Sequence, residues 1–411
     1  MAKVFADRLV VSIDVGTTKI CVLVAHVLDK DHLEIIGVGK APSDGLKKGV
    51  VVDIKKTVHS IKAAIKEAEL MANVTINTAA IGISGGHIHS TNSQGMVAIK
   101  QGEVKETDVA AVMNAARAVA IPEGTQILHA LPQYYIIDSR EKVQNPVGMH
   151  GIRLEVQAHI IMGAIASVQN LVKCCQMADV KVTDIVLEQL ASASAVLSND
   201  EREIGVAMLD IGGGTSDLAI YQNGNIRHTY VLPVAGNHFT NDVAIGLRTT
   251  IKEAERIKKE YGLAHLSLLE NDEYIHLEAV QGGVDQTIMR SDLLSILAPR
   301  SQELLALVHE EIISRKLTHM MPSGLVLTGG GSLLPGMKEL AEEIFNMPVR
   351  IGMVRVDDHN LPQMLHSPIF ATGYGLLKQV LEHRANAMDT ISGPTFNRIL
   401  NRMKSWVTDF F

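Results

Sequence analysis

The chain has 411 residues, of which 46% are hydrophobic, 20% are charged and 4% are aromatic, and its formal net charge at pH 7 is −7. A single hydrophobic core rarely serves a chain of this length, so we expect about two to four subdomains. The acidic balance and the scarcity of aromatic residues argue against a nucleic-acid partner. The 3 cysteines have no regular spacing, and no stretch reaches the roughly 18 apolar residues of a spanning helix, which together favour a cytoplasmic location.

The first part of the chain alternates short β-branched runs with turns. Strands are predicted at residues 9–14, 20–27 and 33–39, and their short connections favour an antiparallel meander. Residues 55–72 place apolar side chains at helical spacing, which predicts an amphipathic helix. A further strand at residues 78–83 leads into a Ser-Gly-Gly turn.

The pattern changes after residue 83, where several short strands surround one helix. This change predicts a separate α+β subdomain inserted at residues 84–159. Its expected elements are strands 95–99, 126–131 and 134–138 and helix 107–120, after which strand 154–162 and helix 167–178 resume the larger pattern.

The second half of the chain repeats its opening. An apolar strand at residues 204–210 ends in Asp before a Gly-rich turn, as the strand at 9–14 does, and a hairpin follows around Gln222–Asn225. Two strands that each end in Asp-x-Gly, with similar flanking hairpins, favour a duplicated core over coincidence. The other elements expected here are strands 218–221, 226–231 and 325–327 and helices 241–247, 251–261 and 292–316.

Three glycine-rich turns follow strands, and together they indicate a phosphate-binding site. Glycines let the backbone approach a phosphate and direct its N–H groups at the oxygens, and nearby hydroxyl and ammonium groups add donors. One such turn alone is weak support, because most of them simply reverse the chain. The candidate nucleotide-binding residues in these turns are Gly16, Thr17, Thr18 and Lys19, then Gly212, Gly213, Gly214 and Thr215, then Gly329, Gly330, Gly331 and Ser332.

Two aspartates stand at the start of the first two turns. Asp14 and Asp210 are expected to lie on opposite sides of one phosphate group, where two carboxylates suit Mg²⁺ bound mainly through water. Either carboxylate can also orient an attacking water. The Walker and Rossmann fingerprints are absent from the sequence, which argues against those nucleotide-binding folds.

The three turns in this order resemble the superfamily of actin, DnaK-type chaperones and sugar kinases. The resemblance implies ATP between two related lobes, with Asp14 and Asp210 near Mg²⁺ and the third turn at the nucleoside. It also implies that Glu255 and Lys258, in an E-x-x-K helix, lie beside the ribose and adenine. Glu188 matches the carboxylate that these chaperones place near the attacking water, although a helix-start acid explains it equally well. An ordinary surface pair explains Glu255 and Lys258 almost as well.

Four further segments resemble the FtsA family of bacterial cell-division proteins, and the likeness extends over essentially the whole chain. The resemblance implies an ATP-binding protein that polymerises with itself at the cytoplasmic face of the inner membrane, at the division site. It also implies partners, namely the C-terminal peptide of the tubulin-like protein FtsZ and later membrane-embedded division proteins. Arg300 and Glu303 match family positions near the FtsZ-peptide surface, or they belong to an ordinary solvated face. The four segments are residues 42–53, 83–88, 131–138 and 145–153.

The last sixteen residues form an amphipathic pattern that stands apart from any family likeness. At 100° per residue the apolar side chains of this stretch fall within one arc, and basic residues outnumber acidic ones on the other side. Lying on an anionic membrane surface explains this better than docking on the protein itself, and eight partly buried apolar side chains predict modest, reversible binding. The apolar residues are Phe396, Ile399, Leu400, Met403, Trp406, Val407, Phe410 and Phe411, and the basic ones are Arg398, Arg402 and Lys404.

These observations predict an α/β, actin-like two-lobed ATPase fold with a duplicated ribonuclease-H-like core. Catalysis is expected to be weak or absent, with ATP acting mainly on conformation and assembly. An actin-like pilus-assembly protein or a small-molecule kinase of the same fold are the alternatives, and a DnaK-like chaperone lacks room for its peptide-binding domain. The expected divisions are lobe 1 (1–83, 160–198 and 360–381), the insertion (84–159), lobe 2 (199–239 and 317–359), its outer subdomain (240–316), a linker (382–395) and the terminal helix (396–411).

Overall fold

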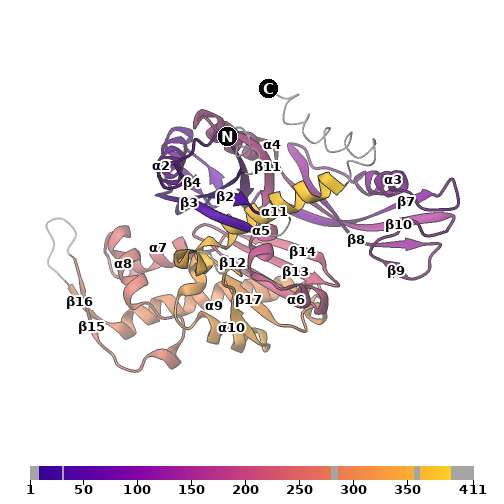
Figure 1. Cartoon of the computed structure of the whole chain (residues 1–411). Coiled ribbons are helices and arrows are strands. Elements are labelled where there is room, and N and C mark those ends of the chain that lie inside the picture. Colours follow the sequence, from indigo (N-terminus) through magenta and orange to yellow (C-terminus); the bar gives the residue numbers. More distant parts are fainter. Residues whose placement is uncertain (1–8, 30–31, 279–285, 356–361, 390–411) are drawn as a thin grey trace.

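The computed structural model describes residues 9–29, 32–278, 286–355 and 362–389, and its centre consists of two five-stranded sheets (Figure 1). The first sheet has the order β11-β6-β1-β2-β3 and the second the order β18-β17-β12-β13-β14. Their strands are β11 (Lys181–Leu187), β6 (Thr78–Ile83), β1 (Leu9–Val15), β2 (Lys19–Val27) and β3 (Leu33–Pro42), and β18 (Val349–Ile351), β17 (Leu325–Thr328), β12 (Val206–Ile211), β13 (Ser216–Gln222) and β14 (Asn225–Leu232).

The two sheets have the same strand pairing. In each, the central strand (β1 or β12) is antiparallel to the next strand in the chain and parallel to the strand on its other side. Asp14 pairs with Cys21 and Asp210 with Asp217, each one pair before the end of its hairpin. The core is therefore a duplicated unit that places Asp14 and Asp210 at equivalent positions.

Helices cover both sheets. The helix α2 (Ile54–Ala72) packs on β2 and β3, and α11 (Ala371–Asp389) packs on β1 and on α5 (Glu188–Val196). Asp53 begins α2 by accepting a hydrogen bond from the Lys56 amide at 3.1 Å. The second sheet packs with α9 (Arg290–Ser314) and α10 (Met337–Phe345) in a separate apolar cluster. The remaining helices and strands of the two lobes are α4 (Ile165–Met177), α6 (Asn199–Ile204), α7 (Gly236–Gly246), α8 (Ile251–Tyr261), β4 (Leu46–Lys47), β5 (Val50–Val51), β15 (Tyr274–Leu277) and β16 (Gln286–Met289).

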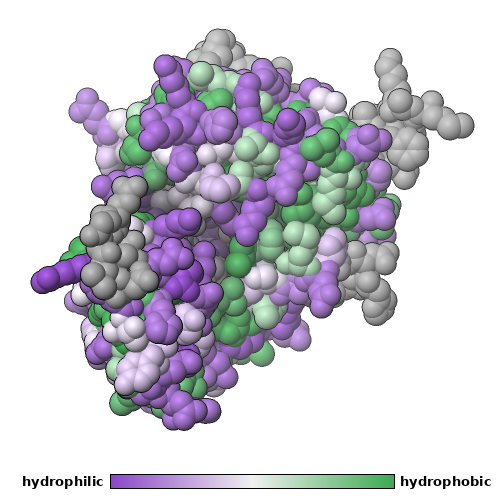
Figure 2. Space-filling view, turned by 90° about the vertical axis from the view of Figure 1, so that its left-hand side faces the viewer, coloured by the Kyte–Doolittle hydropathy of each residue, from purple (hydrophilic) through white to green (hydrophobic). Residues whose placement is uncertain are grey.

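A smaller subdomain projects from the lobes at the right of Figure 1 and has its own apolar cluster. We call it the inserted subdomain. Its four-stranded sheet has the order β7-β10-β8-β9 and carries one helix, α3, against β7 and β10. The elements are β7 (His89–Ala98), α3 (Glu106–Ala116), β8 (Thr125–Ile137), β9 (Lys142–Val143) and β10 (Arg153–Ala164). At the opposite side, the face that carries the β15–β16 hairpin is mostly hydrophilic around a hydrophobic central area (Figure 2).

Several predicted boundaries differ from the structure. The two strands predicted at 126–131 and 134–138 are one strand, β8, which continues through Pro132 with an irregularity in register at Gln133. The helix predicted at 241–247 begins at Gly236, and α3 ends at Ala116 instead of residue 120. The first strand of the second lobe begins at Val206, because the preceding residues form α6. Helix α11 continues to Asp389, so residues 382–389 of the expected linker are helical.

Candidate functional site

The first two glycine-rich turns meet between the lobes. A Cβ added at Gly213 would lie 2.3 Å from Cγ2 of Thr18, and one at Gly214 would lie 2.3 Å from Oγ1 of Thr17. Side chains at these glycines would therefore collide with the β1–β2 turn. The structure brings the turn containing Gly16 against the turn at Gly212–Thr215, although they are about 200 residues apart in the chain.

The third turn lies beside Asp210. Gly329 has a φ of 80°, and a Cβ there would lie 2.2 Å from Oδ1 of Asp210, so both its conformation and its surroundings require glycine. Gly330, Gly331 and Ser332 continue from it in a short 3₁₀ turn, in which the Ser332 hydroxyl donates to the Gly329 carbonyl at 2.7 Å. All three candidate phosphate or nucleoside turns thus lie around one region.

Asp14 is paired with the lysine of its own hairpin. Nζ of Lys19 lies 3.7 Å from Oδ2 of Asp14, donates to the Ile369 carbonyl and lies 5.2 Å from the centre of the Phe370 ring. Burial raises the pKa of Asp14, and the positive charge of Lys19 opposes that rise. The carboxyl group of Asp14 and the ammonium group of Lys19 therefore lie together beside the first glycine-rich turn.

Asp210 is held by two hydroxyl groups from other helices. Ser192 of α5 donates to Oδ2 of Asp210 at 2.5 Å, and Thr372 of α11 donates to the same oxygen at 3.2 Å. Burial raises the pKa of Asp210, the hydrogen bond from Ser192 opposes this, and the charge of Asp14 raises it further. The electrostatic effect of Asp14 on Asp210 shows that the two carboxylates share one environment.

Asp217 is a further carboxylate of the site, and sequence reasoning did not select it. Ser84, the residue after β6, donates to its Oδ1 at 2.5 Å, and Thr215 donates to its Oδ2 at 2.9 Å. Burial raises its pKa to about 7, and the charge of Asp210 contributes to the rise. The available signal was its place at the end of the second glycine-rich turn. Ser84 had no recognisable signal.

Glu188 begins α5 and lies among these aspartates. Desolvation raises its pKa well above the ordinary range, and the charges of Asp14, Asp217 and Asp210 add to the rise. A Cβ at Gly82 of β6 would lie 3.0 Å from Cγ of Glu188, which places the side chain at the end of the first sheet. Four carboxyl groups therefore gather where a bound cation would lower their mutual repulsion.

These carboxylates do not form a direct metal-binding cluster. Among the residues that the structure describes, no three Asp, Glu, His or Cys side chains converge closely enough to hold one ion. A cation near Asp14 and Asp210 would keep most of its ligands as water, which is the usual preference of Mg²⁺.

The E-x-x-K pair of α8 lies beside the second turn. Glu255 contacts Nζ of Lys258 at 2.5 Å and accepts a hydrogen bond from Thr240 of α7 at 2.5 Å. A Cβ at Gly236 would lie 3.1 Å from the Gly212 carbonyl oxygen and 4.0 Å from Nζ of Lys258. Burial lowers the pKa of Lys258 although Glu255 opposes that effect. Sequence reasoning missed Thr240, which orders this pair.

Arg300 and Glu303 lie elsewhere, on α9. Arg300 donates from Nε to Oδ2 of Asp242 in α7 at 2.5 Å, and it also pairs with Glu303 one turn along its own helix. Its guanidinium is therefore engaged with α7, while Glu303 is more exposed. The candidate membrane-binding residues from Phe396 to Phe411 lie outside the described residues. Within the described part of the chain no helix is long and apolar enough to cross a membrane.

Two equivalent sheets that bring glycine-rich turns and acidic strand ends together define the actin-like ATPase fold. The structure is similar to a PilM–PilN type IV pilus biogenesis complex (TM-score 0.63, 17% identity, covering 90% of this chain and 98% of that one). It is also similar to MreB 5 of Spiroplasma citri bound to AMPPNP (TM-score 0.55, 18% identity, covering 92% and 99%). At these identities the likeness shows the fold alone.

Sequence relatives identify the family more narrowly. The profile described as "Cell division protein FtsA" matches residues 207–375, and that of the "SHS2 domain inserted in FTSA" matches residues 85–162. The chain is 44% identical to cell division protein FtsA of Pseudomonas aeruginosa, with both sequences covered completely. It is 36% identical to cell division protein FtsA of Escherichia coli K12, covering 99% of this chain and 97% of that one. The chain belongs to the FtsA family of cell-division proteins.

Proposed function

We propose that the protein binds ATP with Mg²⁺ between its two lobes. The observation that carries the proposal is the contact of the Gly16–Thr18 turn with the Gly212–Thr215 turn, beside Asp14 and three carboxyl groups whose pKa the charge of a neighbouring carboxylate raises, namely Glu188, Asp210 and Asp217. Backbone N–H groups of both turns and the ammonium group of Lys19 are available to phosphate oxygens. Asp14 and Asp210 would orient the water ligands of Mg²⁺, whose charge offsets their repulsion.

Glu188 is the best placed group to hold a proton near the phosphates. Burial and the charges of Asp14, Asp217 and Asp210 raise its pKa, which favours the protonated form over the carboxylate that a general base needs. A cation beside Asp14 and Asp210 would lower the pKa of Glu188 and favour its ionised carboxylate. We therefore expect slow hydrolysis at most, with ATP acting mainly on conformation and self-assembly.

The first test is calorimetric titration of the full chain with ATP, with Mg²⁺ present and then chelated. Binding that needs Mg²⁺ supports the site. Absence of binding under both conditions contradicts it.

We further propose that the protein polymerises on the cytoplasmic face of the membrane, anchors FtsZ there and recruits later division proteins. Membership of the FtsA family supports the division role, and the amphipathic pattern of residues 396–411 supports the anchor. Weak binding of one helix becomes strong when many copies are linked in a polymer, because each bound copy raises the effective concentration of the next.

A truncation that ends at Thr395 tests the anchor. It should bind ATP like the full chain and should no longer sediment with anionic vesicles. Trp406→Glu should have the same effect with less disturbance to the chain. Sedimentation equal to that of the full chain would overturn the membrane assignment.

The FtsZ assignment is tested with the C-terminal peptide of FtsZ and charge reversal on α9. Arg300→Glu should weaken peptide binding in a fluorescence anisotropy titration, with Lys316→Glu, at the exposed region after the same helix, as the matched control. If Arg300→Glu binds the peptide as tightly as Lys316→Glu does, the docking surface lies elsewhere.

A further inference from the structure

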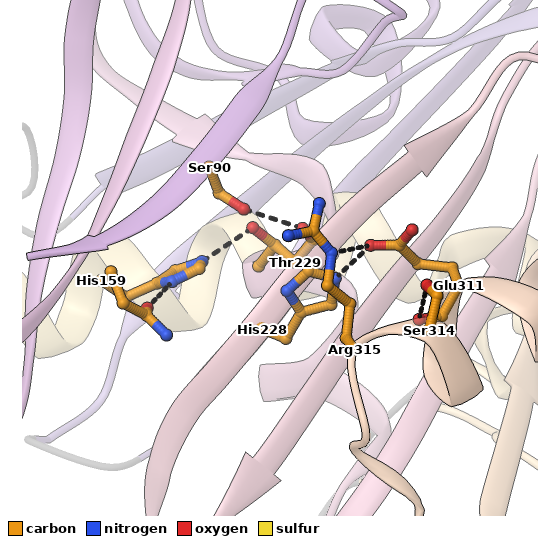
Figure 3. A network of polar contacts seen from close by, with 8 residues as sticks. Ser90, His159, His228, Thr229, Glu311, Ser314 and Arg315 are labelled. Carbon is orange, nitrogen blue, oxygen red and sulfur yellow. Dashed lines mark hydrogen bonds and ion pairs between the residues drawn. The ribbon is translucent and has the colours of Figure 1, made fainter. Parts of the chain in front are cut away.

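Strand β14 is bonded on one face to the inserted subdomain and on the other to α9. Successive side chains of a strand point to opposite faces. Thr229 points toward His159 of β10, and the neighbouring His228 points toward Glu311 of α9 (Figure 3). The edge strand of the second lobe therefore joins two parts of the molecule that are far apart in the chain.

A buried histidine forms the centre of the contact with the inserted subdomain. Nδ1 of His159 lies 2.7 Å from Oδ1 of Asn92 and Nε2 lies 2.9 Å from Oγ1 of Thr229, while Ser90 donates to the Thr229 carbonyl at 2.9 Å (Figure 3). Because Oδ1 of Asn92 can only accept, we assign the ring hydrogen to Nδ1, and Nε2 then accepts from the Thr229 hydroxyl. Burial lowers the pKa of His159 to about 3, so the ring is neutral at pH 7.

Two strand irregularities meet at the next contact. The β8–β10 register skips Gln133, and the β13–β14 register skips Arg227. Nε2 of Gln133 donates to the Ile226 carbonyl at 3.0 Å and to the Arg227 carbonyl at 3.2 Å. The extra residue of one strand thus donates to the carbonyl of the extra residue of the other, Arg227, and to that of its neighbour Ile226. Gln133 is only 4% exposed, so these bonds are shielded from water.

The contacts continue to both ends of β14. At the outer end Gln144 donates to the Asn223 carbonyl at 3.1 Å and accepts from Asn225 at 2.7 Å. At the inner end the Ser84–Asp217 hydrogen bond described above joins the first lobe to β13, beside β14. We call the contacts of Ser90, Gln133, Gln144 and His159 with β14 and its turn, together with Asn92, which bonds to His159 and Gln133, the β14 interface.

The other face of β14 is tied to the end of α9. Nε2 of His228 and Nε of Arg315 lie 3.0 and 3.1 Å from the same oxygen of Glu311 (Figure 3). The His228 and Glu311 side chains are only 14% and 16% exposed, which shields their hydrogen bond from water.

Contacts of the inserted subdomain with the first lobe are of a different kind. Ile88 and Ile161 lie in the large apolar cluster that fills the first lobe and also includes Ile226 and Val231 of β14, and apolar contact is non-directional. The backbone N–H of Leu187 donates to Nε2 of the His129 side chain at 3.1 Å, which adds a polar contact. Glycines lie where the chain enters the subdomain, Gly85 and Gly86, and where it leaves, Gly163. Gly85 has a φ of 135°, a conformation that other residues rarely adopt.

We propose that the inserted subdomain, β14 and the end of α9 move as one rigid unit, although the chain attaches the inserted subdomain to the first lobe. When the lobes change their relative position, the hydrogen-bonded β14 interface stays intact and the glycine connections to the first lobe absorb the movement. A change in the relative position of the lobes therefore also moves the outer surface of the inserted subdomain relative to the first lobe. The idea that ATP triggers this movement rests on the proposed function, whereas the existence of the rigid unit does not.

Distances between spin labels in the full chain test this. The three natural cysteines are buried, so labels attach at introduced cysteines. Suitable exposed positions are Ile152 on the inserted subdomain, Ile313 on α9 and Leu70 on α2 of the first lobe. On addition of ATP and Mg²⁺ the Ile152–Ile313 distance should stay constant while Ile152–Leu70 shifts. A shift in Ile152–Ile313 with Ile152–Leu70 constant would overturn the proposal.

Variants test the interface without any nucleotide. Gln133→Met keeps the length of the side chain and removes its donors, and Thr229→Val keeps the shape and removes the hydroxyl. Either should broaden the Ile152–Ile313 distance distribution of the folded protein. Gln126→Met is the matched control, because Gln126 lies on the same strand and pairs with Gly163 within the inserted sheet.

The two variants also separate this proposal from ATP binding. If ATP moves neither distance, ATP does not trigger the movement, and broadening in Gln133→Met and Thr229→Val still supports the rigid unit. The rigid-unit proposal would be overturned if both variants had the Ile152–Ile313 distance distribution of the wild type. Equal broadening in the control variant Gln126→Met would overturn it too.

Discussion

Hydroxyl groups from other parts of the chain donate hydrogen bonds to the carboxylates of the candidate nucleotide site. Asp210 accepts hydrogen bonds from Ser192 and Thr372, which are 18 and 162 residues away, and Asp217 accepts one from Ser84, 133 residues away. The aspartates themselves were recognisable or nearly so, because each follows or precedes glycines at a strand end. Single serines and threonines have no such local pattern, so their roles depend on tertiary structure that the sequence does not display.

Asp210→Asn should separate nucleotide binding from stability. Burial and the charge of Asp14 raise the pKa of Asp210, so a neutral isostere should leave the melting temperature of the nucleotide-free protein unchanged or higher. Affinity for ATP with Mg²⁺ should fall about tenfold or more, roughly 1.4 kcal/mol, in a calorimetric titration. Asp200→Asn, on exposed α6, is the control. Wild-type affinity in Asp210→Asn would contradict the site.

His159→Phe should change how stability depends on pH. The folded protein keeps His159 neutral down to about pH 3, whereas the unfolded chain protonates it below its ordinary value of 6.5. The unfolded state therefore binds more protons between these values, and this contribution to the free energy of unfolding is lost as pH falls through that window. The variant lacks the contribution, although it is less stable near neutral pH because it loses the hydrogen bonds.

Urea denaturation from about pH 7.5 to about pH 5 measures the effect. The stability difference between wild type and His159→Phe should narrow as the pH falls, by at most about 1.4 kcal/mol per pH unit. A constant difference for His159→Phe would mean that the folded protein does not keep the ring neutral.

Helices and strands that bury one face could be predicted from the sequence. Those that lack a distinct buried face could not. The period of apolar residues located α2 and most strands of both sheets within a few residues, whereas the strands β11 and β18 were not predicted. Residues 189–196 of α5 are all buried, so this helix has no polar face and gave no periodic signal. Strand β8 was divided at Pro132, because proline usually ends a strand, yet β8 continues because Gln133 forms an irregularity beside it.

The contact of α11 with α5 predicts a large difference between two neighbouring glycines. A Cβ at Gly375 would lie 1.8 Å from the Ala191 carbonyl oxygen, whereas one at Gly373 would meet Leu23 at 3.3 Å. Gly375→Ala should cost about 1–3 kcal/mol or more through overpacking, even after a helix-propensity gain of about 1 kcal/mol. Gly373→Ala should cost clearly less in the same chemical denaturation. Similar costs would show that α11 can move away from α5.

At the scale of the whole molecule, the duplication was visible in the sequence and its consequences were not. Two strands ending in Asp-x-Gly revealed the repeat, and the sheets indeed have equivalent orders and pairings. The contact of their turns could be expected only from the family resemblance. The β14 interface, which joins the insertion to the second lobe, combines single polar side chains from four strands and the turns beside them, and left no pattern at all.

A ligand that both lobes enclose should protect both turns at once. Saturation at about 100 times the dissociation constant stabilises the closed form by roughly 2.7 kcal/mol. ATP with Mg²⁺ should therefore slow amide hydrogen exchange in Gly16–Thr18 and in Gly212–Thr215 to a similar extent. The β15–β16 hairpin, remote from both turns, serves as the internal reference. Protection of a single turn would place the ligand on one lobe only.

The packing of α11 has a consequence for synthesis on the ribosome. The Ser12 hydroxyl of β1 donates to the Gly373 carbonyl at 2.8 Å, and Leu376 and Leu377 complete the apolar core around Ile13 and Leu23. These contacts join β1 to a helix that lies 361 residues further along the chain. During synthesis β1 therefore leaves the ribosome long before α11 does, and chaperones have that interval in which to shield its apolar surface.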